Sequence, residues 1–155
     1  MSYGDVSFVA LEEGQEGVFK QCTRSAPWVH FEYWVPSEDQ ILKVEGKLKS
    51  YVNSRIKRKD GIYFSDYYRQ YVGFTSFFGQ RIYINAAYKG LYDSLLVAVT
   101  RAEAGNKEKS EDEKAAVFAS WITKPIVICD GFDAAWGAVY DISSDEIVGF
   151  DYNNQ

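Results

Sequence analysis

Aromatic side chains make up 17% of this 155-residue chain, as 12 Tyr, 10 Phe and 4 Trp, and they constrain its fold more than any other feature. Burying such side chains is favourable, so a chain this rich in them is expected to form a packed core. Hydrophobic residues account for 46% of the chain and only three residues are Pro, which excludes a disordered composition. The length is that of one domain, and no repeat divides it.

One long helix is predicted in the N-terminal half. Ser37 is followed three residues later by Gln40, a capping box in which the serine oxygen accepts from a backbone amide and the glutamine reaches back. Apolar residues then recur at helical spacing over residues 38–54, so the helix is expected to bury one stripe against the rest of the domain.

Shorter helices are predicted after the middle of the chain. Apolar residues recur at helical spacing over residues 88–101, and a second capping box, Ser110 with Glu113, opens a short helix that extends through Trp121. The polar residues 103–113 are expected to form a solvated, charged loop between the two helices.

The remaining segments favour β-structure. Residues 62–87 are rich in aromatic and β-branched residues, and Gly79-Gln80 between two such runs indicates a hairpin turn. The apolar run 124–131 is typical of a central strand, and alternating residues in the last third predict a meander. Residues 1–17 are expected to be either a loose N-terminal segment or an edge strand. The prediction is a single α+β domain with an antiparallel sheet of about five strands, one long helix and one or two short ones.

Charge and motifs exclude several classes of protein. The net charge of −5 argues against binding to a nucleic-acid backbone, which needs a clustered basic surface. No apolar run is long enough to span a membrane, and no motif for a metal or an organic cofactor is present, so none is expected. The start of the chain does not read as a leader peptide, which leaves either a cytoplasmic protein or the mature form of an exported one.

Two alternatives remain open for the cysteines. Cys22 and Cys129 both lie beside apolar or aromatic residues, so they are equally compatible with two buried thiols and with a disulfide. A disulfide would indicate an oxidising compartment. Neither cysteine has a second Cys or His at the spacing of a metal site.

The predicted hairpin suggests a contact surface. Aromatic and arginine side chains anchor many protein interfaces. The same side chains could instead stack on sugar rings or form the outer layer of a small sheet. The residues predicted to form a binding surface for a protein partner are Arg69, Tyr71, Arg81, Tyr83 and Trp136.

A catalytic alternative rests on few residues. Asp130 and Asp133 follow an apolar run and could act as an acid–base pair or bind a cation, with His30 as a nearby base. The spacing lacks the further oxygen ligands of a calcium loop, and carboxylates at such turns usually cap backbone amides. The sequence therefore leans towards a protein that is not an enzyme, with a small enzyme or glycan-binding module as the alternative.

Several strings together resemble an uncharacterised family of small bacterial exported proteins: QCTRSAP, DYYRQYVGF, GQRIYINA, VICDGFDAAWGAVYD and GFDYNN. The resemblance covers about residues 20–153. Family members have a Cys-Asp-Gly-Gly segment, whereas Phe132 stands here in place of the second glycine.

The resemblance implies a periplasmic or secreted protein in which Cys22 pairs with Cys129, and it implies no activity. With the acidic charge and the missing catalytic set, it leads to the expectation of an immunity protein or inhibitor. The expected partner is a secreted toxin or hydrolase, which would be basic if electrostatic attraction speeds association.

Overall fold

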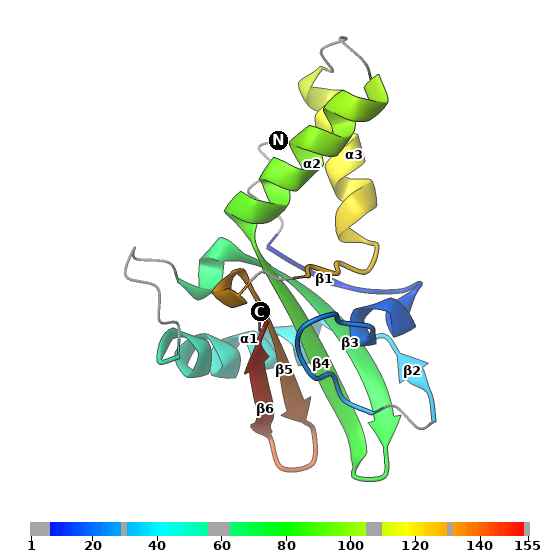
Figure 1. Ribbon diagram of the computed structural model, residues 1–155. Helices are drawn as coiled ribbons and strands as arrows, with labels where there is room; N and C mark the ends of the chain where they lie inside the picture. The colour runs from blue at the N-terminus through cyan, green and yellow to red at the C-terminus, as the bar shows by residue number, and fades with distance from the viewer. Residues whose placement is uncertain (1–6, 29–30, 56–62, 105–109, 130–131, 154–155) are drawn as a thin grey trace.

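The computed structural model describes residues 7–28, 31–55, 63–104, 110–129 and 132–153. They form an α+β fold in which one mixed sheet lies between helices (Figure 1). In chain order the elements are β1 (Phe8–Ala10), a 3-10 turn (Gln15–Phe19), β2 (Tyr33–Trp34), α1 (Glu38–Asn53), a 3-10 turn (Phe64–Asp66), β3 (Tyr67–Ser76), β4 (Gly79–Tyr88), α2 (Lys89–Ala104), α3 (Glu111–Ile122), a 3-10 turn (Phe132–Ala134), β5 (Ala135–Asp141) and β6 (Glu146–Tyr152).

The β3–β4 hairpin is the centre of the sheet, whose order is β1-β3-β4-β5-β6. Its ten residue pairs run from Tyr67 opposite Tyr88 to Ser76 opposite Gly79. The turn therefore consists of Phe77 and Phe78, two residues earlier than the Gly79-Gln80 turn that the sequence suggests. Gly79 has a φ of 101°, a left-handed conformation that favours glycine, so it is the residue after the turn that requires Gly.

Two short strands share the free edge of β3. β1 pairs with Arg69–Tyr71 in parallel, and β2 pairs antiparallel with the residues nearer the turn. The sheet is thus antiparallel except for β1. The edge-strand interpretation of the N-terminal segment is correct for residues 8–10. Leu11 and Val18 are fully buried, whereas Glu12–Gly14 between them are exposed.

Helix α1 covers one face of the sheet and begins as the capping box predicts. The Gln40 amide donates to Ser37 Oγ at 3.3 Å, and the Ser37 amide donates to Gln40 Oε1 at 2.9 Å. The buried stripe of α1 packs on side chains of β3, β4 and β5, which include Tyr71, Ile84 and Trp136. The members of that stripe are Ile41, Val44, Leu48 and Val52.

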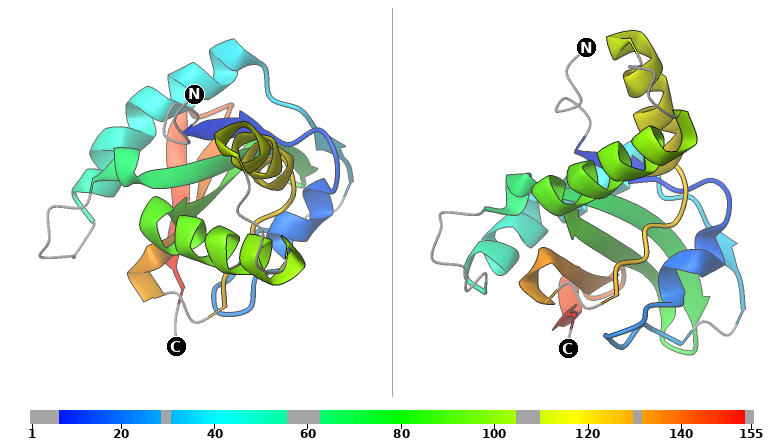
Figure 2. Two further views of the ribbon diagram at one scale, coloured as in Figure 1. Left: turned by 90° about the horizontal axis from the view of Figure 1, so that it is seen from above. Right: turned by 45° about the horizontal axis from the view of Figure 1, so that its top comes forward.

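The opposite face of the sheet is also covered. Figure 2 (left) shows α1 and α2 on opposite sides of the sheet. At one end, Tyr92 of α2 and Ile122 of α3 pack against Tyr68 of β3. At the other end, Leu11 and Val18 pack on β3 and β4. Beyond these contacts, α2 and α3 extend together away from the sheet (Figure 1).

The limits of the charged loop need correction. Helix α2 continues to Ala104, and α3 begins at Glu111, where the Glu113 amide donates to Ser110 Oγ at 3.2 Å. Residues 103–104 and 111–113 of the predicted loop are therefore helical, because the second capping box starts the helix directly after Ser110. Residues 105–109 lie outside the described part of the chain.

The apolar run 124–131 is not a strand. In its described part, residues 124–129, backbone groups bond to side-chain amides of the sheet and not to another strand. The Ile126 amide donates to Gln70 Oε1 at 2.8 Å, and the Ile126 carbonyl accepts from Asn85 Nδ2 at 2.8 Å. These buried polar side chains satisfy the hydrogen-bonding groups of the backbone where the segment crosses the face of the sheet.

Gly73 gives a direct test of the packing between β2 and β3. The ring of Trp34 lies against the Cα of Gly73, so a Cβ there would overlap the ring. Gly73→Ala is expected to lower the free energy of unfolding by about 1–3 kcal/mol, because the ring is packed and cannot move aside freely. The measurement is urea denaturation. Gly46→Ala is the control: nothing lies within 4 Å of a Cβ at this exposed helix position, and Ala there is expected to stabilise by up to about 1 kcal/mol. Equal effects of the two variants would contradict the packing.

Within the described residues, no helix has the length and apolar character that would let it cross a membrane.

Candidate functional site: an aromatic tip beside a shallow hollow

The predicted contact surface is wrong, because four of its five residues are in the core. Arg69, Tyr71, Tyr83 and Trp136 are between 0 and 3% exposed. They also lie on two faces of the sheet, with Tyr83 on the face opposite to the other three. Both faces are covered by other parts of the chain, so these side chains hold layers together. Arg81 alone remains partly exposed.

Arg69 joins the sheet to α1. Its Nε and Nη2 donate to the two carboxylate oxygens of Glu45 at 2.7 and 2.8 Å, and its Nη1 donates to backbone carbonyls of Phe64 and Tyr67. The Tyr71 hydroxyl donates to the same carboxylate. Burial, and secondly the Glu45 charge, raise the pKa of Tyr71 well above its usual value. The guanidinium, the carboxylate, the hydroxyl and the two backbone carbonyls satisfy one another by hydrogen bonds, which indicates a structural link.

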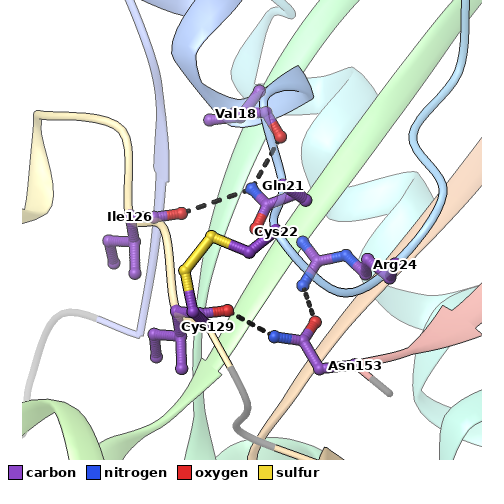
Figure 3. Close-up of a disulfide and its surroundings, with 8 residues drawn as sticks. Val18, Gln21, Cys22, Arg24, Ile126, Cys129 and Asn153 are labelled. Carbon is purple, nitrogen blue, oxygen red and sulfur yellow. Dashed lines mark hydrogen bonds between the residues drawn. A yellow bond between two sulfur atoms is a disulfide. The ribbon is translucent and has the colours of Figure 1, made fainter. Parts of the chain in front are cut away.

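Tyr83 belongs to a buried polar network on the other face of the sheet. Arg24 is the centre of this network: its guanidinium donates to Tyr83 Oη at 3.2 Å, to Asn153 Oδ1 at 2.6 Å and to Asn85 Oδ1. Gln21 donates to the carbonyl of Val18 at 2.7 Å (Figure 3). The network lies between the segment around Arg24 and the sheet.

The disulfide expected from the family resemblance is present. Cys22 and Cys129 are bonded, with their Cα atoms 5.2 Å apart and a separation of 107 residues in sequence (Figure 3). Both residues are exposed, so the alternative of two buried thiols is wrong. The bond joins two segments that cross the same face of the sheet.

The largest exposed apolar side chains gather at the turn of the β3–β4 hairpin. Phe77 and Phe78 form the turn, and the Phe31 ring meets the Phe77 ring edge-on with centroids 5.4 Å apart. Trp28 precedes Phe31 by three residues. We call these four residues the aromatic tip; they are between 61 and 82% exposed. The hairpin turn forms the lower end of the molecule in Figure 1.

A shallow, open hollow of about 300 Å³ lies next to the tip, above β4, β5 and β6. Its lining comes from Ser25–Pro27, from strands β4 and β5, and from residues 148–151 of β6. Gly137 and Gly149 are among the lining residues and have no side chain that would fill it. Because Pro27 is directly followed by Trp28, the hollow and the tip form one continuous surface.

Arg81 connects the hollow to the tip. Its guanidinium carbon lies 4.8 Å from the Phe78 ring centroid, and its Nε donates to Asp141 Oδ2 at 2.9 Å. Asp141 also accepts from the Ser143 hydroxyl at 2.6 Å and from the Ser144 amide at 2.9 Å. The ion pair fixes Arg81 under the aromatic ring, where its charge is largely compensated.

Asp141 is expected to make folding sensitive to acid. The Ser143 hydroxyl, then the Ser144 amide and Arg81, lower its pKa well below the usual range. A depressed pKa gives stability that is complete well above the unfolded value of about 3.9 and is lost as the pH falls through the folded value. Asp141→Asn should therefore unfold more easily at pH 7 but lose less stability between pH 5 and pH 3. Urea midpoints against pH test this; parallel pH curves for variant and wild type would contradict it.

The structure describes only one of the three residues of the catalytic alternative. His30 and Asp130 lie outside the described residues. Asp133 is described, and its carbonyl accepts from the Tyr67 hydroxyl at 2.7 Å, at the 3-10 turn before β5. Within the described part of the chain, no group of three or more His, Cys, Asp or Glu residues could hold a metal ion.

A cluster of shifted titratable groups lies where α2 begins. The Tyr68 hydroxyl donates to Asp93 Oδ1 at 2.9 Å, and Lys89 Nζ donates to Ser7 Oγ at 2.9 Å. Burial is the main cause that raises the pKa of Asp93 and lowers that of Lys89. These contacts tie α2 to β3 and to the N-terminal segment, and they lie outside the lining of the hollow.

The sequence contains one signal for the tip, at residues outside the predicted contact surface. The run SFFG places two phenylalanines between ladder-forming residues and a glycine, and phenylalanine is not a turn-forming residue. Aromatic residues at a turn lie at the end of the hairpin, where a partner can reach them, so they indicate a contact surface.

No protein-family model, no curated protein and no solved structure matches this chain.

Proposed function

We propose that this chain is a non-enzymatic binding protein of a secreted or periplasmic compartment. We further propose that it acts as an immunity protein or inhibitor, by placing the aromatic tip in a concave site of a secreted toxin or hydrolase. The observation on which the proposal depends is the clustering of Phe31, Phe77 and Phe78 at the hairpin turn, all more than half exposed, with the exposed Trp28 three residues before Phe31.

Exposed aromatic residues support binding because they lose much hydrated apolar surface when a partner covers them. Trp, Tyr and Arg dominate the binding energy of many interfaces, and a rigid backbone lowers the entropy cost of contact. Phe77 and Phe78 are held by a ten-pair hairpin, and Arg81 stacks on Phe78. A protruding, rigid tip of this kind suits a cleft better than a flat surface.

The disulfide supports the proposal of a secreted or periplasmic compartment. An exposed bond between Cys22 and Cys129 would be reduced in most cytosols and persists in oxidising compartments. The net charge of −5 supports a basic partner, since opposite net charge speeds association and loses this effect in salt.

Affinity capture from the secreted and envelope fractions of the source organism tests the function. Beads carrying the wild-type chain should retain one stoichiometric protein, and that protein should elute at raised salt. Beads carrying Phe77→Ser with Phe78→Ser are the matched control and should lose it. If both beads retain the same protein, the tip is not the contact surface. If neither retains any protein, the proposed binding function is wrong.

A further inference from the structure

The disulfide joins two segments that cover one face of the sheet. We call residues 20–28 the first strap and residues 124–129 the second strap. Cys22 belongs to the first and Cys129 to the second, and both are exposed at the surface (Figure 3). A soluble dithiol can therefore reach the bond without prior unfolding.

Polar contacts attach both straps to the sheet. Asn153 bridges them: its Oδ1 accepts from Arg24 of the first strap, and its Nδ2 donates to the Ile128 carbonyl of the second. Asn85 does the same, since it accepts from Arg24 and donates to the Ile126 carbonyl. Water can replace the hydrogen bonds that join the first strap to the sheet. The second strap is held in addition by Ile126 and Ile128, whose side chains are buried.

Arg24 makes the attachment of the first strap costly. Its side chain is only 7% exposed, and its three hydrogen-bond acceptors are a tyrosine hydroxyl and two amide oxygens, all uncharged. None of the ion pairs among the described residues includes Arg24. The Asp151 carboxylate lies nearby, since it accepts from the Ser25 amide at 3.2 Å and acts on the charge of the Tyr83 hydroxyl, but it forms no ion pair with Arg24. A buried cation without a directly paired anion is destabilising relative to the hydrated one, so the covalent link offsets this cost.

We propose that the Cys22–Cys129 disulfide is a redox latch on the aromatic tip: oxidised, it holds the first strap on the sheet, and reduced, it releases the strap. In the reduction, one thiolate of a dithiol attacks a sulfur of the bond, and the second thiol of the reductant completes the exchange. Two electrons and two protons pass to the protein, which gains two thiols, and the dithiol becomes a disulfide. The hydration of Arg24 then favours the released strap.

Release of the strap would change the binding surface. The first strap lines the hollow with Ser25–Pro27 and ends at Trp28, a member of the aromatic tip. Phe77 and Phe78 stay on the hairpin, so the surface is divided when the strap leaves. This inference rests on the proposed function for its consequence, but the release of the strap does not.

Hydrogen exchange on the full chain, with and without dithiothreitol, tests the latch without any partner. Amides of residues 20–28 should exchange faster after reduction, while those of β3 and β4 stay unchanged. Unchanged exchange in the first strap would overturn the proposal. Faster exchange throughout β3 and β4 would overturn it too, because it would show general unfolding.

The variant Arg24→Met tests whether the buried charge of Arg24, and not only the loss of the cross-link, drives the release of the first strap. Methionine fills similar volume without charge, so the reduced variant should keep its first strap protected better than the reduced wild type. If reduction frees the strap equally in both chains, the buried cation does not drive release, and that part of the proposal fails.

The consequence for binding is measured by capture from the same fractions with Cys22→Ser and Cys129→Ser introduced together. Beads carrying this double variant should retain much less of the protein that wild-type beads retain. Equal retention would overturn the control of the tip by the latch. If wild-type beads retain nothing, the proposed function fails, and the exchange experiment still decides whether the latch exists.

Discussion

Replacing Arg69 by methionine is expected to lower the free energy of unfolding by about 3–5 kcal/mol, the cost of removing one partner of a buried ion pair. Arg69 is 3% exposed and bonds both carboxylate oxygens of Glu45. Its removal leaves that carboxylate with only the Tyr71 hydroxyl among the described hydrogen bonds, and it leaves two backbone carbonyls without their donor. The α1 face of the core would then contain an uncompensated charge.

Guanidinium denaturation of wild type, Arg69→Met, Glu45→Gln and the double variant measures this as a double-mutant cycle. The double variant should be clearly more stable than Arg69→Met, because the amide that replaces the Glu45 carboxylate has no charge to compensate. A single variant that loses less than about 1 kcal/mol, the value of an exposed pair, would show that the link is not buried as described.

Phe77→Ser with Phe78→Ser is expected to weaken partner binding by about a thousandfold. Two aromatic side chains at the centre of an interface contribute about 2 kcal/mol each, and every 1.4 kcal/mol corresponds to a factor of ten. Both side chains are exposed in the turn, so the free energy of unfolding should change by no more than about 0.5 kcal/mol.

The dissociation constant for the captured protein, measured beside urea midpoints, separates these two effects. Leu95→Ser is the control: it removes an exposed apolar side chain from α2, which lies at the opposite end of the molecule from the hairpin turn (Figure 1). It should leave affinity unchanged. Equal loss of affinity in both variants would place the contact surface elsewhere.

The helices were predictable because their signals are local. The capping boxes at Ser37 and Ser110 each bond the backbone as their spacing requires, and both helices begin at the next residue. The β3–β4 hairpin was predictable from residue type. Its turn was misplaced by two residues, because Gly79 serves the left-handed position after the turn and not the turn itself.

The buried surface could not be predicted from alternation alone. Alternation shows that Tyr71 and Val72 point to opposite faces, but it does not show whether another layer covers each face. Here α1 covers one face, and α2, α3, the straps and the N-terminal segment cover the other. The second strap alternates like a strand, with Ile126 and Ile128 buried, but its backbone bonds to the side chains of Gln70 and Asn85, which come from distant parts of the chain.

The burial of Arg24 could not be predicted from the sequence either. An arginine close to a cysteine and next to a threonine has the appearance of a solvated residue. Its acceptors come from β4 and from Asn153, which are 61 and 129 residues away in the chain. Only the arrangement of the sheet brings them together.

Site-specific photo-crosslinking tests the central claim, that the aromatic tip is the contact surface. A photoreactive phenylalanine analogue is placed either at Phe78 or at Leu95, and each chain is irradiated in the secreted and envelope fractions. Position 78 should give one crosslinked species whose partner peptide comes from a secreted or envelope protein, and position 95 should give none. The same species from both positions, or from position 95 alone, would contradict the account.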